Sequence, residues 1–289
     1  MYVTVSRMSE LSYDVLVTDG PEWAGDARLP DGRPLVWNPG STVLISGAEH
    51  AVLVDAPFTH EQIKAVGDWV EASGKTLTSI YATHGHGDHW FGGHALVERF
   101  PSATVVATKQ TIAMMHQEAT TGREQLWDQI FPGLIPEAPV IAEEVGPDGF
   151  DLEGHRLLPI EVGHTDTDGT TVLHVPDLDL VVAGDSVYNG VHQYLLEGPG
   201  GGFEHWLAAL DVIEALGAHH VVAGHKNRAL ADSPETIAET RMYLRDVMAL
   251  LDDGVTPERF LQEMTTRYPH HLNLSPVWFG GLTLLGGAA

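Results

Sequence analysis

Apolar positions along the chain alternate between short continuous runs, which are typical of buried strands, and a spacing of three and four, which is typical of helices. The short runs predict strands at residues 42–46, 51–55, 77–83, 103–107, 157–162, 171–175, 180–183 and 220–223. The wider spacing predicts helices at about 63–73, 109–130 and 203–213, and two more in the tail at 234–268. This alternation predicts an α/β (α+β) fold in which two stacked sheets are flanked by helices.

The chain has 289 residues and a hydrophobic content of 43%, which suits a large one-domain enzyme with a substantial core. We expect one domain over residues 1–289, with C-terminal helices at about 234–268 packed on it. Two stretches that carry Pro and Gly, 131–139 and 189–202, are predicted to be loops, and the first would suit a mobile cover over a site.

No segment of the sequence indicates export or a membrane span. Residues 1–16 lack the basic and apolar stretches of a signal peptide. No segment approaches the ~20 apolar residues that span a bilayer. We therefore expect a cytoplasmic protein.

The charge of the chain narrows the class of partner. Forty acidic residues stand against 15 basic ones, for a formal net charge of −25. Proteins that bind nucleic acids or anionic membrane surfaces neutralise phosphates with clustered Lys and Arg, so the charge argues against both kinds of partner. The chain has no cysteine, which means that any metal must be held by nitrogen and oxygen donors.

The richest chemistry lies where the predicted strand 77–83 ends. Four metal-ligand types fall within six positions there: His84, His86, Asp88 and His89. Imidazole nitrogen and carboxylate oxygen bind zinc at about 2.0–2.2 Å. The intervening Gly85 and Gly87 let the backbone turn tightly. Four such donors exceed what one tetrahedral ion needs once others join, so the segment predicts two neighbouring ions and further ligands downstream.

Three downstream residues fit that expectation, because each follows a predicted apolar strand. His164 follows the strand 157–162, Asp185 follows 180–183, and His225 follows 220–223. Asp185 and His225 are each separated from their strand by one glycine. Ends of neighbouring strands meet at one edge of a sheet, so these side chains are candidates to join the first cluster.

The order HxHxDH, then GH, GD and GH, resembles that of the metallo-β-lactamase superfamily over His84 to His225. The resemblance implies a four-layer αββα sandwich with its site at the strand ends between the sheets. It implies that His84, His86 and His164 hold a first metal ion, that Asp88, His89 and His225 hold a second, and that Asp185 bridges them. The implied cofactor is two Zn²⁺ ions, with Mn²⁺ or Fe²⁺ as alternatives.

A pair of such ions lowers the pKa of a bound water to about 7. We therefore expect a hydrolase in which a hydroxide bridging the ions attacks the carbonyl of a small ester-like substrate, with Asp88 orienting the nucleophile. Tyr188, three residues after Asp185, resembles the tyrosine with which acyl-homoserine-lactone lactonases hydrogen-bond the substrate carbonyl. As a catalytic residue it would donate to the developing oxyanion; as an ordinary aromatic it would only pack.

These features favour a small-molecule substrate, with a lactone ahead of a thioester or β-lactam. The alternatives are a thioesterase resembling glyoxalase II or a β-lactamase. A second class of alternative is an iron-containing oxidoreductase or a non-catalytic metal-dependent binding protein.

Residues around the ligands have weaker expectations. Asp55, Thr83 and Thr165 are candidates to support metal-bound histidines. Lys226 and Arg228 would meet a substrate carboxylate or lie in a solvated turn, and His192 would face the substrate or pack. An apolar pocket is predicted from Trp90, Phe91, Phe131, Trp278 and Phe279, with packing in the core as the alternative for each.

Overall fold

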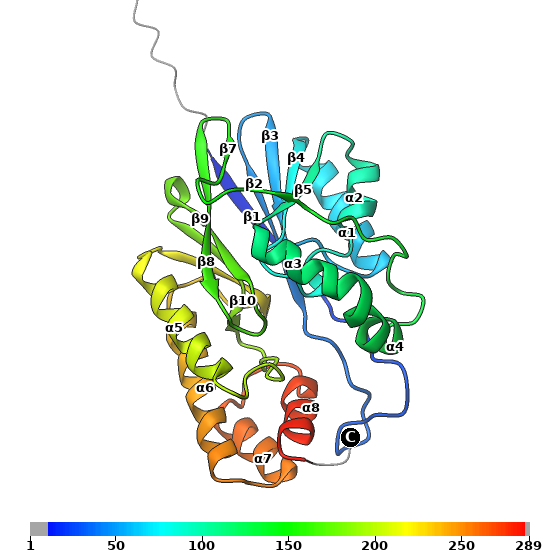
Figure 1. Ribbon diagram of the computed structural model, residues 1–289, viewed down its shortest axis with the longest axis vertical. Helices are drawn as coiled ribbons and strands as arrows, with labels where there is room; N and C mark the ends of the chain where they lie inside the picture. The colour runs from blue at the N-terminus through cyan, green and yellow to red at the C-terminus, as the bar shows by residue number, and fades with distance from the viewer. Residues whose placement is uncertain (1–10, 287–289) are drawn as a thin grey trace, which may run out of the picture.

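The strands of the computed structural model, which describes residues 11–286, form one long sheet that curls so that its two halves face each other (Figure 1). The order along the sheet is β6-β5-β4-β3-β2-β11-β10-β9-β8-β7, and β1 pairs with β2. The first half consists of β1 (Ser12–Thr18), β2 (Gly40–Ser46), β3 (His50–Val54), β4 (Thr76–Tyr81), β5 (Thr104–Ala107) and β6 (Glu143–Glu144). The second half consists of β7 (Phe150–Leu152), β8 (His155–Gly163), β9 (Thr170–Val175), β10 (Leu180–Asn189) and β11 (His220–Lys226).

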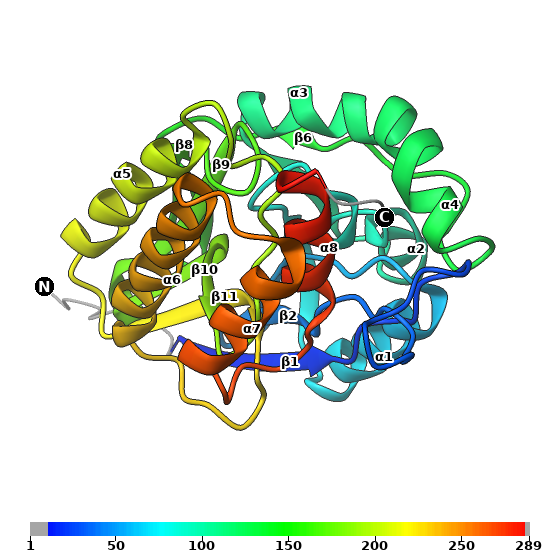
Figure 2. The same cartoon turned by 90° about the horizontal axis from the view of Figure 1, so that it is seen from below.

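Helices cover the outer faces of both halves. The helices of the described chain are α1 (His60–Ala72), α2 (Gly93–Arg99), α3 (Lys109–Gln117), α4 (Asp128–Ile130), α5 (Gly202–Ala215), α6 (Glu235–Asp252), α7 (Pro257–Arg267) and α8 (Ser275–Leu284), with short 3₁₀ turns η1 (Gly87–His89) and η3 (Pro176–Leu178). Figure 1 shows α1 and α2 beside the first half and α5 and α6 beside the second. Seen from below, α8 lies between the arch of α3 and α4 and the helices α6 and α7 (Figure 2).

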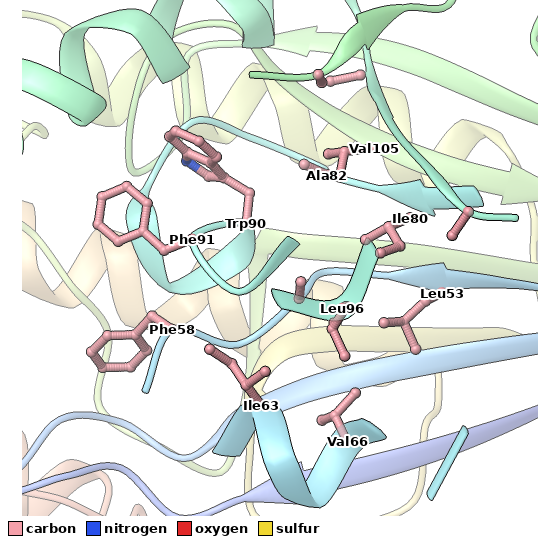
Figure 3. Close-up of a cluster of buried hydrophobic side chains, with 14 of the residues drawn as sticks. Leu53, Phe58, Ile63, Val66, Ile80, Ala82, Trp90, Phe91, Leu96 and Val105 are labelled. Carbon is pink, nitrogen blue, oxygen red and sulfur yellow. The ribbon is translucent and has the colours of Figure 1, made fainter. Parts of the chain in front are cut away.

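Alternation along the strands builds separate cores on the two faces of the sheet. Val52 points inward to a cluster shared by the two halves, whereas its neighbour Leu53 points outward to the helices. Figure 3 shows that outer cluster, in which Leu53 lies near Ile63 and Val66 of α1. In the second half, Val182 joins the inner cluster and Val181 packs with the apolar faces of α5 and α6. The layers are therefore helix, sheet, sheet and helix, which confirms the expected αββα fold.

Most predicted elements are present, and the helix expected at 109–130 differs in kind. Its middle, η2 (Glu118–Trp127), is a π-helix between α3 and α4. A π-helix is uncommon and is frequently found at a functional site. The widened turn places Trp127 in the apolar core, where its indole N–H donates to Glu118.

The first strand and the last helix of the described chain have no counterpart among the predicted elements. Strand β1 was not predicted, because its residues are half-exposed and show no clear alternation. Helix α8 was not predicted either, since it contains two glycines, which disfavour a helix interior. The predicted tail helices are α6 and α7, and α7 begins with Thr256, whose hydroxyl accepts the N–H of Arg259 as expected of a helix start.

Two expectations reach beyond the described chain. The prediction for the segment 1–16 falls partly on residues 1–10, and the domain predicted over 1–289 includes 287–289; both stretches lie outside the described residues. The single domain stays a prediction. Within residues 11–286, no helix is both long enough and apolar enough to cross a membrane.

Candidate metal centre

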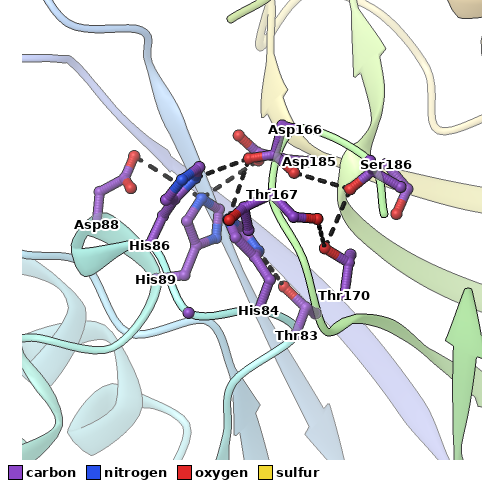
Figure 4. A network of polar contacts seen from close by, with 12 residues as sticks. Thr83, His84, His86, Asp88, His89, Asp166, Thr167, Thr170, Asp185 and Ser186 are labelled. Atoms are coloured by element: carbon purple, nitrogen blue, oxygen red, sulfur yellow. Dashed lines mark hydrogen bonds and ion pairs between the residues drawn. The ribbon is translucent and has the colours of Figure 1, made fainter. Parts of the chain in front are cut away.

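Four segments of the chain meet at the edge where the two halves of the sheet join, and Figure 4 shows the residues of three of them. The loop after β4 carries His84–His89, the loop after β8 carries Asp166, and β10 and β11 carry Asp185 and His225. Backbone packing is tight here, because a Cβ atom at Gly224 would collide with the Asp185 carboxylate. Glycine before His225 is therefore required by space, which the sequence pattern alone did not show.

One group of donor atoms consists of His84, His86 and Asp166. The Oδ2 atom of Asp166 lies 2.8 Å from His86 Nδ1 and 3.6 Å from His84 Nε2. All three donor atoms lie within 4.8 Å of one another. His84 and Asp166 are fully buried, and His86 is partly exposed toward the adjoining pocket.

A second group consists of Asp88, His89 and His225, with Asp185 between the groups. His225 Nε2 lies 3.3 Å from Asp88 Oδ2 and 3.1 Å from Asp185 Oδ2. The other oxygen of Asp185 lies 3.2 Å from His89 Nε2. Asp185 also forms a compact donor group with His84 and His89. Asp185 therefore contacts the second group directly and lies close to His84 of the first.

Each histidine of the cluster is oriented by an oxygen on its other ring nitrogen. Nδ1 of His84 lies 3.0 Å from Thr83 Oγ1, and Nδ1 of His225 donates to the Pro39 carbonyl. The partner of His86 Nε2 is a carboxylate oxygen of Glu197, 3.1 Å away. An oxygen on the far nitrogen fixes the tautomer and aims the near nitrogen at the centre.

Asp55 is the carboxylate beside the outer ring nitrogen of His89, in an ion-pair contact that lacks hydrogen-bond geometry. Its Oδ2 lies 3.1 Å from His89 Nδ1 and also accepts the Thr83 hydroxyl. Asp55 has a positive φ of 61°, an uncommon conformation that directs its carboxylate back under the loop. Thr83, the second candidate supporter, therefore links Asp55 to His84.

Five buried nitrogen or oxygen atoms of the cluster make no hydrogen bond within the described part of the chain. They are His84 Nε2, His89 Nδ1, His89 Nε2, Asp166 Oδ2 and Asp185 Oδ1. Buried polar atoms are rarely left this way, because each loses its water without compensation. His89 Nδ1 faces Asp55, and the other four atoms belong to residues of the donor groups, whose ligand atoms lie within 4.8 Å of one another in each group. The arrangement fits divalent cations, and its nitrogen and oxygen donors suit zinc, manganese or iron.

The charges of the cluster also favour bound cations. Burial works against protonation of His89, yet the carboxylates of Asp185 and Asp88 raise its pKa well above the ordinary value. Burial is outweighed at His225 too, where the same carboxylates raise the pKa to about 10. Three carboxylates in a buried space thus create a strong preference for positive charge, which metal ions satisfy.

The structure does not bring His164 into the cluster. Its Nε2 donates to the carbonyl oxygen of Glu197 at 2.9 Å, and its Nδ1 lies 2.7 Å from Asp168. Both ring nitrogens are therefore engaged away from the donor groups. The place expected for His164 as a ligand of the first ion is taken by Asp166, two residues further along the same loop.

Asp166 is held in place by the threonines around it. Thr165, the third candidate supporter, donates its hydroxyl to Asp166 Oδ1, which leaves Oδ2 to face the histidines. Asp166 and Thr165 are buried, with 1% and 0% of their surface exposed. A carboxylate two residues after a candidate histidine is the signal that the sequence offered, but the pattern could not decide which of the two turns inward.

Tyr188 contacts the centre through one of its donor residues, Asp185. Its hydroxyl donates to Asp185 Oδ2 at 2.8 Å, and the side chain is buried. A comparable contact joins Trp37 to Asp88, whose Oδ2 accepts the indole N–H at 2.7 Å. No local pattern pointed to Trp37, because this hydrogen bond joins residues 51 positions apart.

A pocket opens beside the donor groups, with His86, Asp88, Asp185 and His225 on its floor. Its walls come from the segment before β2, from η2, from the loop after β10 and from α8; they include Trp23, Trp37, Leu126, Trp127, Tyr194, Leu196 and Phe279. Of the residues predicted to line an apolar pocket, Phe279 does so. Trp90, Phe91 and Phe131 belong to the core, and Trp278 donates to the carbonyl of Arg28.

Other candidates for substrate contact lie elsewhere. The ammonium group of Lys226 pairs with Asp232, and the guanidinium of Arg228 pairs with Asp19. His192 is buried, and its Nδ1 lies 2.9 Å from the hydroxyl of Tyr243 rather than facing the pocket. The predicted cover at 131–139 does not line the pocket, and η2 takes that place.

A family model described as the metallo-beta-lactamase superfamily matches residues 35–225, which is more than half of the 289-residue chain. The chain therefore belongs to the metallo-beta-lactamase superfamily. The resemblance inferred from the ligand order is confirmed. A curated relative, hydroxyacylglutathione hydrolase of Rhizobium meliloti (strain 1021), is 30% identical over 146 residues, which is 50% of this chain and 44% of that protein. The match thus spans less than half the length of this relative.

Solved structures of the superfamily share the fold. A metallo-beta-lactamase family protein from Thermus thermophilus aligns with a TM-score of 0.61 and 18% identity over 94% of both chains. A metallo-beta-lactamase from Pontibacter korlensis aligns with a TM-score of 0.58 and 17% identity, over 82% of this chain and 99% of that one. Both likenesses show the αββα architecture.

The range that the superfamily model matches contains the donor residues but only part of the pocket wall. All donor residues of the centre, from His84 to His225, lie within 35–225. Trp23 and Phe279, on opposite ends of the sequence, lie outside that range and meet across the pocket with ring centroids 5.0 Å apart. The floor of the pocket is thus built from the segment that the family model matches, and part of its wall comes from segments on either side of that range.

Proposed function

We propose that this protein is a hydrolase that holds two divalent metal ions, with zinc favoured, and cleaves a small ester-like substrate, with a lactone favoured. The observation that carries the proposal is the set of buried donor atoms that make no hydrogen bond and belong to groups whose ligand atoms lie within 4.8 Å of one another. His84, His86 and Asp166 would hold the first ion. Asp88, His89 and His225 would hold the second, and Asp185 would contact both.

A pair of divalent ions supplies an activated water at neutral pH and an electrophile for a carbonyl oxygen. The chain positions the groups around that chemistry. Trp37 fixes the carboxylate of Asp88, which we propose as the residue that orients the nucleophile. Tyr188 fixes Asp185 in the same way.

The tyrosine that meets the substrate is, in this proposal, Tyr194 rather than Tyr188. Tyr194 lines the pocket, and its ring lies edge-on to His86 with centroids 5.6 Å apart. Burial raises the pKa of Tyr194 to about 12, so the phenol keeps its proton at neutral pH. It is therefore a suitable hydrogen-bond donor to a carbonyl oxygen that gains negative charge.

A thioesterase is the second candidate, and the match to a hydroxyacylglutathione hydrolase favours it. Lactones and thioesters place the same demands on the centre, because both present a carbonyl and an activated leaving group. What separates them is the part of the substrate that the pocket must accept.

The test is metal analysis of the purified protein together with a substrate panel. We expect about two divalent ions per chain, loss of hydrolysis after chelation, and recovery on adding Zn²⁺, Mn²⁺ or Fe²⁺. The panel contains lactones, acyl-glutathione thioesters and a chromogenic cephalosporin, and lactones should be cleaved fastest. Iron with oxygen uptake, or metal binding without hydrolysis of any member, would overturn the proposal.

A matched pair of variants ties activity to the centre. Asp185→Asn keeps the shape of the side chain but removes its charge, and should lower both metal content and hydrolysis, the latter by at least about 100-fold. Asp252→Asn makes the same change at the exposed end of α6 and should alter neither. Wild-type activity in Asp185→Asn at full metal content would rule out its bridging role.

A further inference from the structure

The pocket beside the metal centre has walls of aromatic and aliphatic side chains and no cationic one. Among the described residues that line it, none is Lys or Arg. The aromatic walls contact one another: the rings of Trp23 and Trp37 lie 5.7 Å apart, and those of Trp37 and Trp127 lie 5.1 Å apart. An anionic group in this space would lose its water and find neutral donors, such as Asn38 and Tyr194, but no Lys or Arg to balance its charge.

Basic residues of the surrounding segments are already paired. Arg123 of η2 donates to Asp128 and to the carbonyl of Pro136. Lys226 directly follows His225, but its ammonium group pairs with Asp232 and its side chain is 4% exposed. A substrate carboxylate would have to break one of these contacts to obtain a counter-charge.

The centre itself also offers little attraction to an anion. Three carboxylates, those of Asp88, Asp166 and Asp185, lie among the donor groups. They offset most of the charge that a pair of divalent ions would bring, and Glu197 adds a fourth carboxylate against His86. A histidine in the place of Asp166 would leave the centre more positive by one charge.

From these observations we propose that the pocket binds an uncharged apolar part of the substrate, an alkyl or aryl group next to the reacting carbonyl, and rejects substrates that carry a carboxylate there. This inference rests on the proposed function for the reaction but not for the binding step. It places a simple aliphatic lactone ahead of a glutathione thioester, whose peptide part carries carboxylates. Trp23 and Phe279, which line the wall, become the specificity-determining residues.

Binding to the metal-loaded protein tests the inference without turnover. The probes are five-membered lactams, which resemble lactones but resist hydrolysis, with a hexyl side chain or with the same chain ending in a carboxylate. Three tryptophans line the pocket, so intrinsic fluorescence reports occupancy. We expect the carboxylate to weaken binding at least about 10-fold, and each methylene of the neutral series to tighten it about 3- to 4-fold. Equal or tighter binding of the carboxylate would overturn the inference.

A pair of variants tests whether α8 determines the preference for neutral over anionic ligands. Phe279→Arg puts a cation into the wall and should shift the neutral-to-anionic ratio of dissociation constants at least about 10-fold toward the anion. Thr283→Arg adds the same charge to an exposed position of the same helix and should leave the ratio unchanged. Thermal melting and metal content show whether each variant is folded and loaded. An unchanged ratio in a folded Phe279→Arg would contradict the assignment; if that variant does not fold, the wild-type comparison of the two lactams decides.

The outcomes keep the two proposals apart. If lactams bind as expected but no lactone or thioester is hydrolysed, the proposed reaction fails and the apolar pocket stands. If hydrolysis occurs but acyl-glutathione thioesters are cleaved as efficiently as neutral lactones, the reaction stands and the inference about the pocket fails.

Discussion

The two halves of the molecule supply the metal centre in different ways. The first half delivers four donor residues from one turn, His84–His89, where the chain leaves β4. The second half delivers one donor from each of three separate segments: Asp166 from the loop after β8, Asp185 from β10 and His225 from β11. A single turn fixes its side chains through local sequence, whereas separate segments fix theirs only through packing of the whole sheet. The second half is therefore where sequence and structure disagree.

The disagreement over His164 and Asp166 gives the largest expected effect. Asp166→Ala should reduce hydrolysis to the background rate and lower metal content from about two ions per chain to about one, because it removes a donor of the first ion. His164→Ala should keep both ions and retain most of the activity, since His164 only contacts the carbonyl of Glu197 and Asp168. Metal analysis and initial rates measure both.

The reverse outcome would show that the loop rearranges when metal binds. If His164→Ala loses the first ion and Asp166→Ala keeps it, the ligand set implied by the sequence resemblance is right. His86→Ala is the reference variant for either case, because both ligand sets include it, and it should abolish hydrolysis while the protein stays folded.

The difference between the two halves also explains which parts of the site and the fold could be predicted from the sequence. Six donor residues were correctly predicted to be neighbours, because a polar residue after an apolar run, with Gly between them in two cases, is a local signal. They are His84, His86, Asp88, His89, Asp185 and His225. The helix-sheet layers followed from the same pattern. All of this information is carried by contiguous residues.

Contacts between distant segments could not be predicted in this way. Trp37 and Asp88 are held together by the meeting of the segment before β2 with the loop after β4, and nothing near either residue indicates the pairing. The choice between Tyr188 and Tyr194 depends on the direction in which the chain leaves β10. Helix α8, whose Phe279 completes the pocket wall, has two glycines and so lacks a strong helical pattern.

The two tyrosines after Asp185 allow a second test, of which one donates to the substrate. Tyr194→Phe should lower kcat by about 100-fold with metal content unchanged, because it removes a donor to the developing oxyanion. Tyr188→Phe should act mainly on the centre, since its hydroxyl contacts Asp185 and is buried. Steady-state kinetics with metal analysis separate the two. A greater loss of kcat in a fully loaded Tyr188→Phe would restore Tyr188 as the substrate donor.

Trp37 gives a smaller effect, on affinity for metal. Trp37→Phe keeps an aromatic ring in the wall but removes the N–H that holds Asp88, so we expect binding of the second ion to weaken about 10-fold. Trp127→Phe is the matched control, because Trp127 lines the same pocket and its N–H donates to Glu118 instead. Competition with a chromophoric chelator measures the affinity. Equal affinities in the two variants would show that the indole N–H does not matter to the centre.

The smallest effect concerns a buried histidine that the centre does not use. His192 lies in the loop after β10, where burial lowers its pKa to about 3. An unfolded chain would protonate this residue near pH 6.5. The folded protein therefore has the full stability contribution of this group above that pH and loses it as the pH falls from there toward 3. Between pH 7.5 and 6.0 this single group should cost about 0.8 kcal/mol of unfolding free energy.

A variant that cannot titrate isolates the contribution of His192 from that of the other acidic and basic groups. Over the same interval, His192→Asn should lose about 0.8 kcal/mol less unfolding free energy than the wild type, although it is less stable at every pH. His94→Asn, at a partly exposed position on α2, should follow the wild type. Urea unfolding at the two pH values, with the same metal content, measures the difference. Identical pH dependence in His192→Asn and wild type would mean that His192 is protonated in the folded protein as readily as in the unfolded one, and that its burial against Tyr243 does not exclude the charged form.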